Sequence, residues 1–74
     1  MTNLTPQQIA GKNLRKFIIS AKYKSQEDFA FEYGADIRTI NRYINDGINK
    51  IDAIQNLAQY LHVSFMDFFV EDEE

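Results

Sequence analysis

The chain has 74 residues, enough for one domain, and its 45% hydrophobic and 26% charged residues are typical of a globular protein. It contains no cysteine, which excludes a disulfide framework, a thiolate zinc site and a cysteine nucleophile. The formal net charge is −3, but four of the eleven acidic residues form the terminal run 71–74, so residues 1–70 carry eight basic residues against seven acidic ones. Residues 1–24 contain no acidic residue and five basic ones, which are Lys12, Arg15, Lys16, Lys22 and Lys24.

The first predicted helix begins at Thr5. Thr5 can cap the helix, Pro6 suits the first helical position, and Gln8 completes a capping box. We expect the helix to fray near residues 22–24. Apolar residues recur at helical spacing and predict one face turned to a core: Ile9, Leu14, Phe17, Ile18 and Ala21.

A second, shorter helix is predicted from Ser25 to Tyr33. Ser25 can cap it, with Asp28 three residues later as the other half of a capping box. Gly34 is placed to adopt the left-handed conformation that ends a helix. The helix therefore has about two turns, because only eight residues separate its cap from its stop.

A third helix is predicted from residue 37 to about residue 45. Asp36 can cap it, and residues 46–47 form a turn signal after it. Helical periodicity turns Ile40, Tyr43 and Ile44 inward. The same periodicity turns another set of side chains outward, which are Ile37, Arg38, Asn41, Arg42 and Asn45.

Two further helices complete the predicted domain. Residues 51–61 carry an apolar stripe of Ile51, Ile54, Leu57, Ala58 and Leu61. A Ser64–Asp67 capping box opens a short fifth helix. No segment shows sustained period-two alternation, so we expect an all-α domain of five helices over residues 1–70, followed by an acidic, disordered tail at 71–74.

Residues 25–43 form the most informative stretch. Two short helices are joined there by a tight turn that carries Gly34, and the small Ala30 lies where the helices should cross closely. This is the pattern of a helix-turn-helix unit, whose second helix can enter the major groove of DNA.

At these residues the chain resembles the lambda-repressor-like (Cro-type, xenobiotic-response-element) family. That family reads Ser/Thr-Gln-Glu-x-Leu-Ala, then Gly-Val-Ser, then Thr-Ile-Ser-Arg, and here the counterparts are residues 25–30, 34–36 and 39–42. Its later Asp-x-Leu-x-x-Ile-Ala-x-x-Leu helix and Val-Ser-x-x-x-Leu-Phe ending correspond to residues 52–61 and 63–69. Each motif is short, but their order and spacing over roughly residues 9–69 are specific.

The resemblance implies a compact five-helix domain that binds a double-stranded DNA operator as a homodimer and regulates transcription, in the first place as a repressor. Base-facing roles carry over to Ile37, Arg38, Asn41 and Arg42. Phosphate contacts carry over to Gln26, Thr39, Asn45, Asn49 and Lys50. Outside that set, Lys12, Arg15 and Lys16 either add phosphate contacts or only solvate the first helix.

The sequence also departs from the family pattern. The family often pairs an arginine of the first helix with a glutamate of the third, and the matching positions here are Ile18 and Ile44. His62 stands where a glycine usually follows the fourth helix. The connector before Gln26 is one residue longer, and the turn before Asp52 is one residue shorter.

The alternatives belong to other functional classes. We expect no enzyme, cofactor or metal site, because the chain offers no nucleophile–base pair, glycine-rich phosphate loop or second histidine beside His62. The rival interpretation is a protein-interaction module that retains the fold without DNA binding, with an exposed Phe31 or the apolar surface around Phe68 as its contact. With no signal peptide, no membrane span and no evident small-molecule site, we expect a cytoplasmic protein.

Overall fold

The computed structural model describes residues 4–71, which form four α-helices, one short 3₁₀ helix and no strand. The elements are α1 (Pro6–Ser20), α2 (Gln26–Tyr33), α3 (Ile37–Asp46), α4 (Ile51–Leu61) and η1 (Phe65–Phe69). The all-α class is confirmed, but the expected count of five helices is wrong. The fifth segment has only five residues, and it winds as a 3₁₀ helix, the form that short helical pieces often take. Most of the predicted tail, residues 72–74, lies outside the described residues.

Helix α1 begins as its sequence predicts. The Gln8 amide donates to the Thr5 hydroxyl at 3.2 Å, and the Thr5 amide donates to the Gln8 side chain at 3.0 Å. The helix ends at Ser20, so Ala21 is its C-cap and is exposed rather than buried in the core as expected. Lys22 then takes a left-handed φ of 70°, which turns the chain into the connector.

The core gathers around α1. Its buried face consists of Ala10, Gly11, Asn13, Leu14 and Ile18, and it contacts every other helix. Gly11 permits the close approach of α1 to α3, because a Cβ at that position would clash with the Tyr43 carbonyl oxygen of α3. The backbones of α1 and α3 therefore meet at a place where any larger residue would force them apart.

Local signals set the boundaries of α2 and α3. The Ser25 hydroxyl accepts from the Asp28 amide at 3.1 Å, although only this half of the predicted capping box forms. Gly34 ends α2 in the left-handed conformation with φ 89°, as predicted. Asp36 then caps α3 by accepting from the Arg38 amide at 2.9 Å. The two helices are thus joined by a turn of three residues.

Helix α4 buries Ile54, Leu57 and Ala58. Ile51 was expected in the same stripe but is 64% exposed, because it is the first residue of α4 and precedes the run of buried positions. His62 ends the helix in the left-handed conformation with φ 61°, the conformation for which glycine is the usual residue.

The C-terminal segment is held by a buried amide that the sequence did not reveal. The Asn13 side chain, 5% exposed, donates to the Phe68 carbonyl at 2.7 Å and to the Val70 carbonyl at 2.9 Å. Phe68 itself is fully buried. Its ring packs edge-on against the ring of Phe17, with the two ring centroids 5.0 Å apart. Parts of the chain that lie 55 and 57 positions apart are therefore joined through α1.

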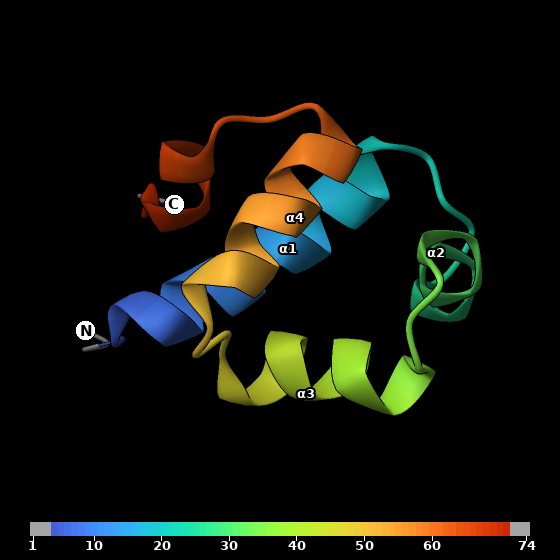
Figure 1. The fold of residues 1–74 in the computed structure, drawn as a ribbon, viewed down its shortest axis with the longest axis horizontal. Helices are drawn as coiled ribbons and strands as arrows, with labels where there is room; N and C mark the ends of the chain where they lie inside the picture. Colours follow the sequence, from blue (N-terminus) through green and yellow to red (C-terminus); the bar gives the residue numbers. More distant parts are fainter. Residues whose placement is uncertain (1–3, 72–74) are drawn as a thin grey trace.

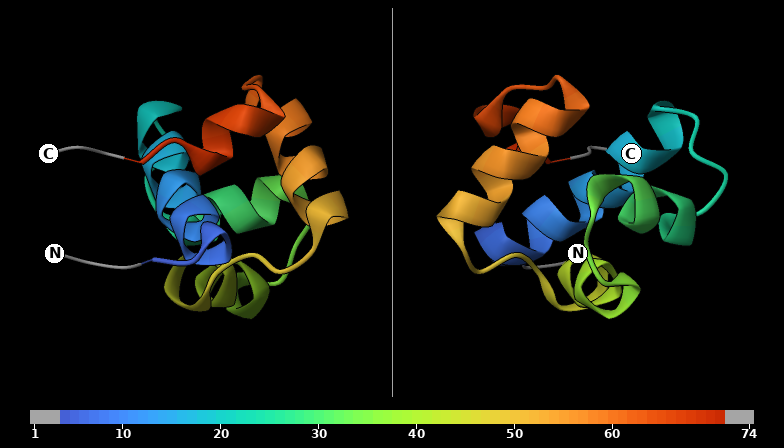
Figure 2. Two further views of the ribbon diagram at one scale, coloured as in Figure 1. Left: turned by 90° about the vertical axis from the view of Figure 1, so that its left-hand side faces the viewer. Right: turned by 45° about the vertical axis from the view of Figure 1, so that its right-hand side comes forward.

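Helix α3 occupies one edge of the bundle. In Figure 1 it runs along the lower side, beneath α1 and α4, with α2 at one end. The two views of Figure 2 are turned about the same vertical axis, and in both of them α3 is again the lowest of the four α-helices. The side of α3 that faces away from α1 is therefore left uncovered by the other α-helices.

Candidate nucleic-acid interface

The outward side of α3 is polar. Arg38, Asn41, Arg42 and Asn45 are all exposed, and their spacing of three and four residues places them in one stripe along the helix. The opposite side holds the fully buried Ile40, with Tyr43 and Ile44 packed against the core. Because that apolar side anchors the helix, the stripe is presented on a rigid support rather than on a loop.

Two other residues assigned to the interface lie deeper. Ile37 is half-buried and packs against the core, so only part of its side chain remains accessible. Thr39 is also half-buried. The exposed part of the stripe is therefore carried by arginine and asparagine side chains, which offer hydrogen bonds rather than apolar contact.

Arg38 has one acidic neighbour. Its Nε lies 3.8 Å from Oδ1 of Asp36, and the two side chains are 87% and 56% exposed. An ion pair as exposed as this one contributes little free energy. Asp36 is already engaged as the cap of α3, so the Arg38 guanidinium keeps most of its donors directed to solvent.

A hollow of about 560 Å³ adjoins the C-terminal end of α3. The sequence predicted phosphate contacts for Gln26 and Asn45 separately and left the role of the basic residues of α1 undecided. The structure brings both groups together, because the walls of this hollow come from α1, from the start of α2 and from the end of α3. They are Lys12, Arg15, Lys16, Gln26, Ile44 and Asn45.

The remaining phosphate candidates lie in the connector after α3. Asn49 and Lys50 are both exposed, and Lys50 is the N-cap residue of α4, where its side chain forms no capping hydrogen bond. The connector is held at its start, since the Ile48 amide donates to the Gln7 carbonyl of α1 at 3.0 Å and the Ile48 side chain is buried. That anchoring could not be predicted, because residues 48–50 by themselves indicate only a connector.

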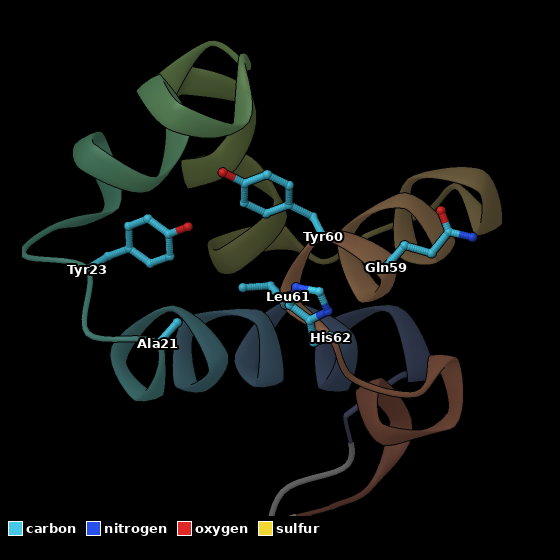
Figure 3. Close-up of a pocket in the computed structure, with 6 residues that line it drawn as sticks. All are labelled: Ala21, Tyr23, Gln59, Tyr60, Leu61 and His62. Atoms are coloured by element: carbon cyan, nitrogen blue, oxygen red, sulfur yellow. The ribbon is translucent and has the colours of Figure 1, made fainter.

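A second hollow, of about 500 Å³, lies between the connector after α1 and the end of α4, and Figure 3 shows the residues that line it. The hydroxyls of Tyr23 and Tyr60 point toward one another there. A hydrogen bond with Tyr60 raises the pKa of Tyr23 to about 12. Burial raises the pKa of the neighbouring Tyr33 hydroxyl. The ring centroids of Tyr33 and Tyr60 lie 4.9 Å apart. Tyr23 belongs to the connector that leads into α2, so its hydrogen bond links that connector to Tyr60 of α4.

Two kinds of feature are absent from the described part of the chain. Residues 4–71 contain no group of three or more histidine and acidic side chains able to hold a metal ion. Within the same residues, no helix is long and apolar enough to cross a membrane. Comparison of the chain with protein-family models, with curated proteins and with solved structures gives no match.

Proposed function

We propose that this protein is a sequence-specific DNA-binding regulator of transcription, in the first place a repressor, that inserts α3 into the major groove of an operator. The observation that carries the proposal is the exposed polar stripe of α3, on the second helix of a pair joined by a three-residue turn. That helix pair is the arrangement by which helix-turn-helix proteins dock on DNA.

The chemistry of the stripe suits base recognition. Arg38 and Arg42 carry guanidinium groups whose fork matches the O6 and N7 acceptors of guanine. Asn41 can pair with the N6 and N7 edge of adenine. The accessible part of Ile37 can contact a thymine methyl group. These side chains read sequence, whereas Gln26, Thr39, Asn45, Asn49 and Lys50 bind phosphates and set the register.

The resemblance of residues 9–69 to the lambda-repressor-like family supports the same function. In that arrangement two copies bind as a homodimer in the cytoplasm, with their α3 helices in successive major grooves about 34 Å apart. The operator is then roughly palindromic, because a two-fold symmetric dimer reads the same half-site twice.

The proposal is tested by footprinting on genomic fragments, including the DNA upstream of its own gene. We expect a protected, two-fold symmetric site. Arg38→Ala and Arg42→Ala should each weaken binding to that site by about 5- to 150-fold, the loss of about 1–3 kcal/mol for one bidentate base contact. Lys24→Ala is the matched control, since Lys24 is an exposed cation outside the stripe.

Thermal unfolding of each variant checks that a loss of binding is not a loss of stability, because replacing exposed side chains of α3 should leave the fold unchanged. Equal losses in all three variants would mean that the arginines act only as charges. A folded parent protein that binds no fragment at low salt would overturn the proposal.

One observation favours a second candidate, a protein-interaction module. Phe31 is 86% exposed, and it shares the outward face of α2 with the exposed Glu27, Asp28 and Glu32. An aromatic ring among carboxylates suits a basic protein surface with an apolar pocket. In that case Phe31→Ala would abolish partner binding, and Arg38→Ala would leave it intact.

A further inference from the structure

We propose that the hollow lined by Lys12, Arg15 and Asn45 is a seat for a backbone phosphate of the bound duplex, at the end of the groove that α3 enters. This inference rests on the proposed DNA-binding function and extends its contact surface to α1. It concerns the three basic residues whose role the sequence left undecided, Lys12, Arg15 and Lys16, and it assigns them a single ligand.

The composition of the hollow matches a phosphate. Lys12, Arg15 and Lys16 supply positive charge from one face of α1, at the spacing of three and four residues that aligns side chains on a helix. Gln26 and Asn45 supply side-chain amide donors from α2 and α3. Ammonium and guanidinium groups form the strongest hydrogen bonds to phosphate oxygens, and amides complete the set.

No acidic side chain lines the hollow. The nearest carboxylates along the chain are those of Glu27, which follows Gln26, and Asp46, which follows Asn45; both residues are exposed, and neither lines the hollow. Three of the eight basic residues therefore gather at one place on a protein whose net charge is −3. Such a local field attracts a polyanion despite the unfavourable total.

The hollow also lies where the duplex backbone should pass. Asn45 is both the last residue of the exposed α3 stripe and a wall of the hollow, so the two surfaces are continuous. A helix in the major groove is flanked on each side by a sugar-phosphate strand. One sugar-phosphate strand would thus meet Gln26 and the basic face of α1. Asn49 and Lys50, which follow Asn45 in the chain, would contact phosphates outside the hollow.

A close backbone contact between α1 and α3 fixes the position of the site. Gly11 of α1 meets the Tyr43 carbonyl of α3, and both positions adjoin residues that line the hollow, Lys12 and Ile44. The backbone of α1 that carries the basic side chains is thereby held at a set position relative to the exposed stripe of α3. A phosphate bound there would position α3 in the groove as well as contribute affinity.

The test compares a double variant, Lys12→Gln with Arg15→Gln, against a matched control, Lys22→Gln with Lys24→Gln. Both pairs remove two exposed cations, but only the first removes walls of the hollow. The affinity of each protein for an operator duplex and for a random duplex is measured as the NaCl concentration is raised, and circular dichroism verifies that both variants are folded.

We expect the hollow variant to lose affinity for both duplexes by similar factors. The slope of log affinity against log salt concentration should become less steep by about 0.9, because the hollow seats one phosphate and each neutralised phosphate contributes about 0.9. Between about 50 and 200 mM salt, its affinity should therefore fall about three- to fourfold less than that of the parent. The control pair should retain a slope close to that of the parent.

Two results would overturn the inference while leaving the proposed function intact. One is a hollow variant whose slope changes no more than that of the control, in a parent protein that binds DNA. The other is a hollow variant that loses affinity for the operator duplex but not for the random duplex, because a contact to a backbone phosphate carries no sequence information. Failure of the parent to bind any duplex would instead contradict the proposed function itself.

Discussion

The α2–α3 segment, residues 25–46, and the C-terminal segment, residues 62–70, both pack against α1, but they are held in different ways. The first is delimited by local features, which are the Ser25 cap, the left-handed Gly34 and the Asp36 cap. The second has a local capping box at Ser64, yet its position depends on the side chain of Asn13, more than fifty residues earlier. Local features therefore set the bounds of α2 and α3, whereas a long-range contact holds the C-terminal segment in place.

Asn13→Ala should produce the larger effect on stability. It removes both donors to the carbonyls of Phe68 and Val70 and leaves the buried Phe68 carbonyl without its partner. We expect the free energy of unfolding to fall by about 1–3 kcal/mol, the cost of an unsatisfied buried polar group. Urea denaturation measures the loss, and Asn56→Ala on the exposed side of α4 is the matched control.

Hydrogen exchange then locates the effect of Asn13→Ala. Amides of residues 67–70 should exchange faster in the variant, while those of α3 should change only by the global loss of stability. An equal local increase in α2 and α3 would contradict the separation between the two segments.

Gly34→Ala should produce the smaller effect and act on the other segment. The position has a φ of 89°, and a Cβ added there would meet no atom within 4 Å, so the penalty is backbone strain alone. We expect a loss of about 1 kcal/mol in thermal or urea unfolding. Gly34→Asn should cost less, because asparagine tolerates the left-handed region. An alanine variant as stable as the parent would show that the turn is not strained.

The same contrast explains how far the sequence predicted the fold. Caps and stops depend on a few neighbouring residues, so the bounds of α2 and α3 could be predicted from Ser25, Gly34 and Asp36. Asn13 could not be recognised, because nothing near it in the chain identifies the carbonyls that it meets. Ile51 and Ala21 were wrongly assigned to the core, since periodicity gives the face of a helix but not the point along it where a neighbour begins.

The candidate site divides in a similar way. Helical periodicity alone places Arg38, Asn41, Arg42 and Asn45 on one exposed stripe, and the structure agrees. The hollow could not be predicted, because its walls come from three helices whose approach depends on Gly11. A helical glycine in sequence signals only weak helix propensity, and the carbonyl that it admits lies 32 residues later at Tyr43.

The most direct test follows the amide chemical shifts of the labelled protein while a short random duplex is added at low salt. We expect the shift changes to concentrate on the exposed stripe of α3, at Arg38, Asn41 and Arg42, and to extend around the hollow to Lys12 and Arg15. The outward face of α2 around Phe31 should change little. Shift changes confined to that face of α2, or none at all from the folded protein, would contradict the claim that α3 is a DNA-reading helix.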